Sequence, residues 1–526
     1  MGTKVHNNYE DLITFTRASG GHALRPVSYG SELVNNPTFD SDTTGWAKNP
    51  DTPSLTLEVD SSRLKITSTA AMGARQDVTT QAGKLYRVEW EYTEGTLSSS
   101  NVSVRAYPSG EFTGESNDTP ATTGYINFVA TGSEARIYLR NDGVGTSFFD
   151  NVSVKEVNFD KSDGSLTLYE HPDDVPRVEY DADGNRLGLL VEESRTNLIP
   201  SSDADDWTGA SGATTSPITE TTLGAFTGKT VISQGQTWHR ATSGLFSATS
   251  GTTYTVTAFY KAGTSGKVYI DFRIPTESSV IKGNVGSLSV SSNAAGTAAI
   301  LSQETLPQGV YKVVFTVVAN ATASNCIVGI GANSSTSGET VIALAAQVEQ
   351  ASFGTSYIKT TGSSATRSAD TVEISGDVFG LNDKEGTMFI EFDQTYVEGG
   401  TGFPRAVELG NDSTSVQRCN IYITESTNRL TAALNTNNVN QGILALNTSL
   451  TGTLPMTKVA YGFADNNLGA SDNGDTALTD TAADFSGATN KRNQITFGTS
   501  SFVGHIKSFK YYPRRLTNAQ LEDLSS

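Results

Sequence analysis

The 526-residue sequence has few cysteines and no long apolar run. Its two cysteines, Cys326 and Cys419, are too few for a disulfide framework or a cysteine-rich zinc site. No stretch approaches the roughly 18 apolar residues that a membrane-spanning helix needs. The polar N-terminal residues also lack the apolar segment of a secretory signal. We therefore expect a chain that is made in the cytosol, forms no disulfide and does not insert into a membrane.

Charge is also scarce, and positive charge is scarcer than negative. Charged residues make up 18% of the chain, and 37 Lys and Arg residues face 56 Asp and Glu residues, which gives a net charge of −19. Such a charge repels phosphate backbones, so a nucleic acid is not an expected partner. We attribute the excess of acidic residues to solubility rather than to a specific cationic partner.

What the sequence does contain is typical of an all-β protein. Glycine is abundant, at 50 residues, and hydrophobic residues reach only 36%, which suits sandwiches of short strands with one apolar face on each sheet. The length predicts about three domains. We predict three tandem antiparallel β-sandwiches joined by short linkers.

One module occurs twice. Gly83–Gly95 aligns without a gap on Gly251–Gly263, and every aligned pair is separated by 168 residues, the difference between 83 and 251. Both segments alternate apolar and polar residues, as a strand with one buried face does. We predict that the two modules superpose strand for strand, with Tyr86 on Tyr254 and with Trp46 near Trp207.

The alternation and the turn residues set the domain boundaries. We predict an entry segment (1–30), a first β module (31–157), a hairpin connector (158–196), a second β module (197–360), a linker (361–371) and a third β module (372–526). In the last strand, Ile506 differs in parity from Phe509 and Tyr511, so burying all three needs a bulge or twist near Ser508, or burial of both strand faces. A short helix over 517–524 should follow, because Thr517 and Gln520 form a capping box.

Three segments together resemble a modular family of tailed-phage virion proteins. They are the FTRAS motif at Phe15–Ser19, GLLVEESRTNL at Gly188–Leu198, and Gly354–Ile358 ahead of Thr366–Asp370. The resemblance implies carbohydrate-binding jelly rolls and a terminal laminin G-like or concanavalin A-like domain. It also implies that the entry segment lies against the hairpin. The first jelly roll sits where the family often has a short spacer, so we interpret it as an inserted module.

The resemblance further implies a location and partners. We expect exposure on the outside of a virion assembled in the host cytoplasm, contact with other virion proteins, and binding to host or environmental glycans. Virion fibres are usually trimers, but no heptad run or β-helical repeat is present to drive trimerisation. Jelly rolls often hold structural Ca²⁺, and the resemblance makes Asp40, Asp42 and Asp150 its candidate ligands.

Catalytic and metal motifs are weak. Asp181–Asn185 imitates the start of a calcium-binding loop, but Arg186 occupies the position that requires glycine, so a hairpin turn is the better interpretation. Glu391 and Asp393 point the same way on a strand, as a retaining glycosidase pair must; we interpret them as solvent-facing carboxylates. The histidines are scattered without metal spacing: His6, His22, His171, His239 and His505.

Tryptophans are the best candidates for a ligand surface, because the C–H face of a sugar packs on an indole ring. Trp90 lies in an alternating strand and aligns with Ala258, which favours a core position. Trp46 and Trp207 occupy equivalent places in the two copies, which favours a shared structural role. Trp238 has no counterpart. The predicted ligand-binding set is Trp238, His239, Arg240 and Trp207.

These observations favour a non-enzymatic virion surface protein, a tail fibre, tail tip or capsid appendage, that attaches to glycans. Two alternatives stay open. One is a purely structural head fibre or decoration protein without a ligand. The other is a polysaccharide depolymerase, for which we would expect carboxylates clustered in one cleft.

Overall fold

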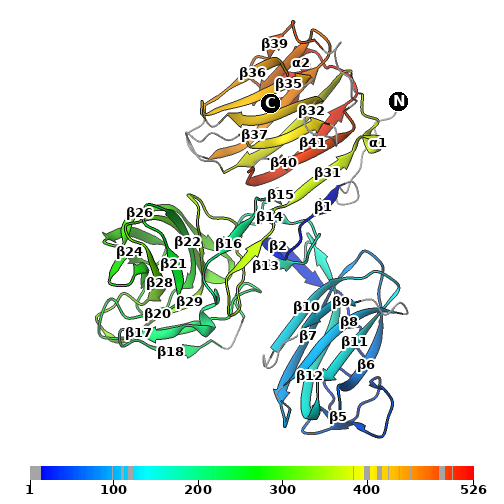
Figure 1. The fold of residues 1–526 in the computed structure, drawn as a ribbon, viewed down its shortest axis with the longest axis vertical. Coiled ribbons are helices and arrows are strands. Elements are labelled where there is room, and N and C mark those ends of the chain that lie inside the picture. The colour runs from blue at the N-terminus through cyan, green and yellow to red at the C-terminus, as the bar shows by residue number, and fades with distance from the viewer. Residues whose placement is uncertain are drawn as a thin grey trace. The chain divides into compact units, whose positions relative to one another are not determined.

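The structure is a computed structural model, and it describes residues 13–97, 99–107, 112–116, 123–218, 221–382, 384–395, 403–410, 417–424, 426–436, 439–449, 453–484, 492–499 and 501–526. The predicted all-β class is confirmed: antiparallel sheets pair face to face around separate apolar cores (Figure 1). The chain divides into two compact units, Pro26–Ser165 and a second made of Met1–Arg25 with Leu166–Ser526.

The unit Pro26–Ser165 is one sandwich. Its first sheet contains β10 (Thr123–Val129), β7 (Leu85–Glu94), β12 (Val144–Phe159), β5 (Leu64–Thr69) and β4 (Leu55–Val59), and the end of β2 (Gly21–Tyr29) pairs with β12. Its second sheet is β3 (Ala47–Asn49), β6 (Met72–Thr79), β11 (Glu134–Asn141), β8 (Ser100–Tyr107) and β9 (Phe112–Ser116). Alternate residues of both sheets fill the core, which includes Trp46, Trp90 and Phe128.

The second unit holds a sandwich over the predicted second jelly roll. One sheet is β17 (Thr208–Ala210), β20 (Arg240–Thr242), β28 (Ala323–Gly331), β23 (Lys267–Ile274), β24 (Glu277–Asn284) and β25 (Ser287–Asn293), with β21 (Phe246–Ala248) also beside β28. The other is β18 (Thr214–Pro217), β19 (Lys229–Gln234), β29 (Ser337–Glu349), β22 (Thr253–Lys261), β27 (Val310–Ala319) and β26 (Gly296–Leu306). Turns of 3-10 helix lie at Ala204–Asp206 and Pro307–Gly309.

The repeated strands are equivalent, as predicted, whereas superposition of the whole modules stays a prediction. β7 lies between β10 and β12, and β22 lies between β27 and β29, so the repeated segment is the same inner strand in each copy. The Tyr86 hydroxyl accepts a hydrogen bond from Gln81 N at 3.0 Å, and Tyr254 accepts one from Thr249 N at 2.8 Å. The duplication therefore extends to single hydrogen bonds within each copy.

Glycine is required at the start of both repeated strands for the same reason. Gly83 and Gly251 have φ values of 81° and 79°, in the left-handed region that side chains rarely adopt. Each donates its N–H to the carbonyl of an alanine at the end of a neighbouring strand, at 2.8 Å from Gly83 to Ala130 and at 2.7 Å from Gly251 to Ala319. This turn explains why the alignment begins at a glycine.

The C-terminal sandwich also has two sheets. The first is β1 (Thr14–Thr16), β31 (Thr371–Ser375), β40 (Gln494–Thr499), β33 (Arg405–Gly410), β34 (Gln417–Thr424), β35 (Arg429–Thr436) and β36 (Val439–Ser449). The second is β14 (Val178–Tyr180), β15 (Arg186–Val191), β41 (Gly504–Tyr512), β32 (Gly386–Gln394), β37 (Leu454–Phe463), β38 (Leu468–Asp472) and β39 (Leu478–Asp480). It therefore takes β1 from the predicted entry segment and β14 with β15 from the predicted connector.

The remaining short elements lie between these bodies in sequence. β13 (Ser165–His171) neighbours β2, and β16 (Arg195–Asn197) pairs with β30 (Ala365–Arg367). β30 falls within the predicted linker, where Arg367 and Asp370 are nonetheless buried. This stretch is thus structured by pairing and burial.

The predicted bulge and helix are both present in the described chain. The register of β41 against β32 shifts between Ser508 and Ile506, which lets Ile506 enter the core while Phe509 and Tyr511 pack against it. α2 (Asn518–Ser525) begins after Thr517 with the expected capping box, and it buries Leu521 against β37. A single-turn helix, α1 (Gly376–Phe379), was not predicted.

One histidine ties the hairpin to the C-terminal sandwich. The ring of His505, in β41, donates from Nδ1 to Asp393 at 2.9 Å and from Nε2 to Glu179 of β14 at 2.8 Å. Burial lowers the pKa of His505, but the hydrogen bonds to the two carboxylates outweigh that effect and raise it to about 10. His505 is therefore a cation at neutral pH.

His505→Gln should reveal this charge as a pH-dependent loss of stability. Because the folded pKa lies above the ordinary value of 6.5, the stabilisation is fully present below pH 6.5 and is lost as the pH rises to about 10. We expect the variant to unfold about 2 kcal/mol more easily at pH 6 and nearly like the parent near pH 10. Urea unfolding of both proteins across this range measures the difference, and a pH-independent difference would contradict the assignment.

Candidate functional site

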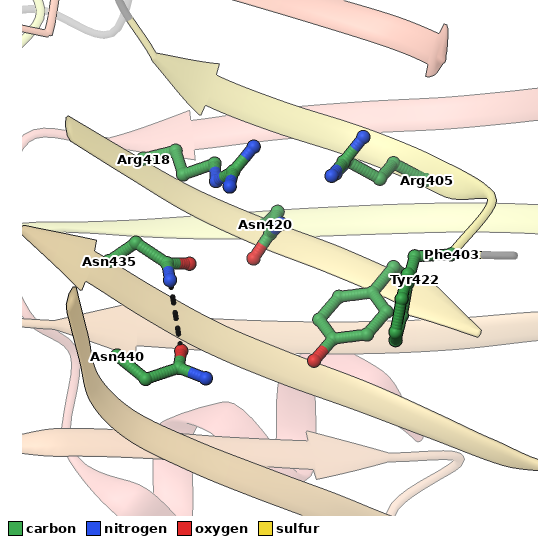
Figure 2. A pocket seen from close by; sticks show the side chains of 7 residues that line it. All are labelled: Phe403, Arg405, Arg418, Asn420, Tyr422, Asn435 and Asn440. Carbon is green, nitrogen blue, oxygen red and sulfur yellow. Dashed lines mark hydrogen bonds between the residues drawn. The ribbon is translucent and has the colours of Figure 1, made fainter. Parts of the chain in front are cut away.

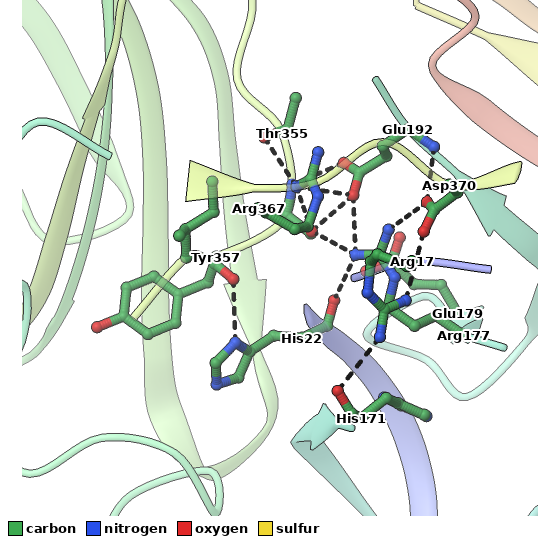
Figure 3. A network of polar contacts seen from close by, with 12 residues as sticks. Arg17, His22, His171, Arg177, Glu179, Glu192, Thr355, Tyr357, Arg367 and Asp370 are labelled. Atoms are coloured by element: carbon green, nitrogen blue, oxygen red, sulfur yellow. Dashed lines mark hydrogen bonds and ion pairs between the residues drawn. The ribbon is translucent and has the colours of Figure 1, made fainter. Parts of the chain in front are cut away.

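The three motifs that carried the family resemblance meet in a buried network of ion pairs (Figure 3). Asp370 accepts from Arg17 Nη1 at 3.3 Å and from Arg177 Nη2 at 2.5 Å. Glu192 accepts from Arg177 Nη1 at 2.9 Å and from Arg367 Nη1 at 3.0 Å. All five side chains are 2% exposed or less. Buried ion pairs thus join the motifs, in addition to the apolar core that Phe15 shares with Leu189 and Val191.

Electrostatics in this network favours the ionised forms. Burial alone would raise the pKa of Glu192, but Arg367 and Arg177 hold it at about 2. Burial lowers the pKa of Arg17 to about 10, with the charge of Arg177 adding to the fall. For Arg177, burial acts in the same direction, but Asp370 and Glu192 together raise its pKa. Each of the two carboxylates is paired with two arginines inside the protein, which indicates a structural network.

The network confirms that the entry motif lies against the segment before the hairpin. Arg17 N donates to Asp174 Oδ1 at 2.9 Å, and Arg17 Nη2 donates to the Pro172 carbonyl at 2.8 Å. His22 Nδ1 lies 3.0 Å from the Tyr357 carbonyl, which joins the entry segment to the GTSYI motif as well.

The four predicted ligand-binding residues do not form one surface. Trp207 is 1% exposed, and its indole N–H donates to the Ser201 carbonyl at 3.0 Å, much as Trp46 donates to the Asn36 carbonyl at 3.3 Å. Trp207 is therefore a core residue with no face free for a sugar. That part of the prediction is wrong because both copies use this tryptophan to close the sandwich.

His239 and Arg240 are also buried, whereas Trp238 is 50% exposed. His239 Nδ1 accepts from Gln234 N at 2.8 Å. Arg240 Nε lies 3.2 Å from Asp271 Oδ1, and its Nη1 donates to the Trp238 carbonyl at 2.9 Å. Both polar side chains support the backbone beneath Trp238, so only the indole itself is available to a ligand.

The three predicted calcium ligands are not gathered around one point. Asp42 Oδ1 accepts from Thr44 N at 2.9 Å in a local turn, and Asp40 Oδ2 accepts from the Thr38 hydroxyl at 2.9 Å. Burial raises the pKa of Asp150, and the charge of Asp40 adds to the rise. Across the described residues no group of three His, Cys, Asp or Glu side chains is placed to hold a metal ion. The calcium site stays a prediction.

The carboxylate pair on β32 is engaged with neighbouring cations. Glu391 Oε1 lies 3.1 Å from Lys507 Nζ, and Asp393 is the partner of His505. His6 lies outside the described residues. The Asp181 carboxylate accepts from Asn185 N at 2.8 Å, which is the predicted hairpin turn.

A pocket in the described chain lies on the outward face of the first sheet of the C-terminal sandwich (Figure 2). Along β34, Cys419, Ile421 and Ile423 enter the core. Strict alternation therefore turns the residues between them outward. The cavity has a volume of about 160 Å³. Side chains of β33, β34, β35 and β36, together with one residue just before β33, line the cavity: Phe403, Arg405, Arg418, Asn420, Tyr422, Asn435 and Asn440.

One end of the pocket is aromatic and one side is lined by amides. The rings of Phe403 and Tyr422 meet edge to face with their centroids 5.8 Å apart, and Phe403 is 48% exposed. Asn435 Nδ2 donates to Asn440 Oδ1 at 3.0 Å, which leaves further donor and acceptor capacity on both amides. Exposed rings beside paired amides suit a ligand with an apolar face and several hydroxyl groups.

The remaining side of the pocket is cationic. Arg405 and Arg418 extend from adjacent strands toward each other over Asn420 (Figure 2). Glu408 Oε2 lies 3.1 Å from Arg405 Nε and 3.9 Å from Arg418 Nη1. Burial lowers the pKa of Arg405, Glu408 opposes that effect, and the charge of Arg418 adds to the fall. Two guanidinium groups thus share one carboxylate among the residues that the structure describes here.

Sequence reasoning missed all seven pocket residues. The alternation in Gln417–Thr424 does indicate a strand with a polar outward face. Nothing in that pattern separates a binding surface from an ordinary solvated one. The pocket arises only when four strands are placed in register, where Arg405 pairs with Tyr422 and Asn420 with Ala433.

No family model matches the chain, and no curated protein matches it. Among solved structures, it is similar to a CBM4 domain (16% identity, TM-score 0.20, 23% of this chain and 99% of the other). It is also similar to the tandem CBM22 domains of a Paenibacillus barcinonensis protein, with 9% identity, a TM-score of 0.20, and coverage of 62% of this chain and 99% of the other. Trypanosoma rangeli sialidase matches with 10% identity, a TM-score of 0.22, and coverage of 96% of this chain and 94% of the other. At these TM-scores the similarities carry no argument about function. No helix of the described chain is long and apolar enough to cross a membrane.

Proposed function

We propose that this chain is a non-enzymatic glycan-binding protein of the surface of a phage virion, a tail fibre, tail tip or capsid appendage. The pocket on the C-terminal sandwich is the observation that carries glycan binding. The virion setting rests on the family resemblance of the FTRAS, hairpin and GTSYI motifs. Other virion proteins are its proposed partners, with trimerisation as the proposed assembly state.

The pocket suits a sugar because it combines the two kinds of contact that a sugar ring needs. Phe403 and Tyr422 present exposed aromatic surface on which the C–H face of a pyranose packs. Asn420, Asn435 and Asn440 line the same cavity and offer amide groups to hydroxyls. The site is broad and shallow rather than deep, which fits the end or the side of a chain better than a small enclosed metabolite.

A binding role is preferred to a depolymerase because the described carboxylates do not face one another across this pocket. Glu408 is the partner of the pocket arginines, and Glu391 and Asp393 are held by Lys507 and His505 on the second sheet. Neither arrangement places an acid and a base on opposite sides of a ligand. Incubation with a host polysaccharide and assay of new reducing ends tests this part of the proposal.

Phe403→Ala should weaken glycan binding by about tenfold to a hundredfold, because one face of the stacked ring is lost. The glycans to test are those that the full chain binds on a glycan array. Isothermal titration with the best array glycan measures the affinity. Trp238→Ala is the matched control, since it removes an exposed aromatic ring of similar exposure from another sandwich.

Each outcome separates the candidates. Loss of binding in Phe403→Ala alone supports the pocket. Loss in Trp238→Ala alone would move the site to the second jelly roll and retain glycan binding. If the parent binds no glycan on the array, the purely structural alternative is favoured. Light scattering on the same preparation decides whether the protein is a trimer.

A further inference from the structure

We infer that the pocket selects acidic glycans, with the sugar carboxylate between Arg405 and Arg418 and the sugar ring on Phe403 and Tyr422. This inference rests on the proposed glycan binding and adds the substrate class. The ligand group that we infer is the carboxylate that uronic and sialic acids have in common, so either kind of acid would fit.

The first argument is the charge balance of the site. Glu408 lies within 4 Å of both arginines but makes a close contact only with Arg405, at 3.1 Å. Arg418 Nε is buried and has no hydrogen-bond partner among the described residues. The Arg418 side chain as a whole is 22% exposed where it lines the pocket, so a bound oxygen would contact its terminal nitrogens. A bound carboxylate would place a negative charge beside Arg418, which Glu408 approaches only at 3.9 Å.

The second argument is the geometry of the two donors. A guanidinium group presents a planar fork of N–H donors that matches a carboxylate, and this match is better than that of an ammonium group. With its amide oriented to satisfy both neighbours, Asn420 accepts from Arg405 Nε at 3.3 Å and donates to the Ala433 carbonyl at 3.1 Å. This contact holds Arg405 at the floor of the pocket. The arginines are therefore placed side by side, and Asn420 lies between them (Figure 2).

The net charge of −19 acts against an acidic ligand, but its effect is long-range. At physiological salt, charges separated by more than about 8 Å are largely screened. The guanidinium groups would contact the carboxylate directly in a partly desolvated cavity, where screening is weaker. The local pair thus outweighs the overall charge. The overall charge would instead repel acidic polymers from other parts of the surface, so acidic glycans would bind mainly at the pocket.

The test compares matched acidic and neutral glycans on the full chain. Trigalacturonate is paired with galactotriose, and sialyllactose is paired with lactose, so the uronic and sialic sources are separate arms. We expect at least one acidic member to bind about tenfold or more tightly than its neutral partner. Arg418→Gln should abolish that preference, and Arg418→Lys should retain part of it.

Arg514→Gln is the matched control, because it removes the same charge from an exposed position of the same sandwich outside the pocket. Its preference should equal that of the parent. Equal binding of acidic and neutral members by the parent, or a preference that Arg418→Gln leaves intact, would overturn the acidic-glycan inference and leave glycan binding standing. Failure of the parent to bind any array glycan would overturn both. Thermal unfolding of each variant shows whether a loss comes from the site or from the fold.

Discussion

Asp370→Ala should lower the free energy of unfolding by about 3–5 kcal/mol, because it leaves buried charges without their partner. The Asp370 carboxylate accepts from Arg17 and Arg177, and also from Glu192 N at 2.9 Å. Without it, two guanidinium groups would stay in a region from which water is excluded. Urea unfolding followed by circular dichroism measures the change.

The control for this prediction is an ion pair at the surface of the same unit. Lys312 Nζ lies 3.4 Å from Glu304, and both side chains are substantially exposed. Glu304→Ala should cost no more than about 1 kcal/mol, since water screens the pair and solvates whichever partner is left. If the two substitutions had equal effects, the Asp370 network would be worth no more than a surface contact.

The network also gives the family motifs a physical meaning. Arg17, Glu192 and Arg367 lie in three different motifs, and each charge is buried by residues of the other two. Removing Glu192 would leave Arg367 without its carboxylate partner in the network, and removing Asp370 would do the same to Arg17.

The duplication shows how far sequence reasoning reaches when contacts are local. Tyr86 and its hydrogen-bond partner are five residues apart, as are Tyr254 and Thr249. Such contacts repeat whenever the short segment repeats, so an ungapped alignment predicts them. The capping box of α2 and the bulge of β41 belong to the same class, because each depends on neighbours in sequence or on strict alternation.

Neither the pocket nor the buried network could be predicted from the sequence, and the reason is the same for both. Arg17 and Asp370 are 353 residues apart, and no periodicity or spacing selects that pairing among the other charged residues. The same holds for Trp238 and Trp207, which sequence alone ranked together. Their exposure differs because one lies in the loop before β20 and the other closes the core. Chemistry that depends on which strands become neighbours is set by topology.

Truncation before Phe509 should abolish the cooperative unfolding of the C-terminal sandwich. β41 is an inner strand between β15 and β32, and its last four residues pair with Thr387–Ile390. Their removal leaves backbone groups of β32 unpaired, which is costly inside a sheet. It also removes Phe509, whose ring meets Phe497 edge to face at 5.0 Å and so joins the two sheets. We expect a broad, early thermal transition in place of a sharp one.

A shorter truncation before Asn518 isolates the part of this effect that belongs to the strand. It deletes only α2, whose buried residue Leu521 packs on Ala460 and Leu516 outside the main core. That loss should lower the melting temperature and keep the transition sharp, because both sheets retain all their strands. The comparison also discriminates between two views of the fold. If the sandwich cut before Phe509 melted like the one without α2, Phe509–Tyr512 would add nothing to its cooperativity, because both truncations retain Gly504–Ile506, the part of β41 that pairs with β15.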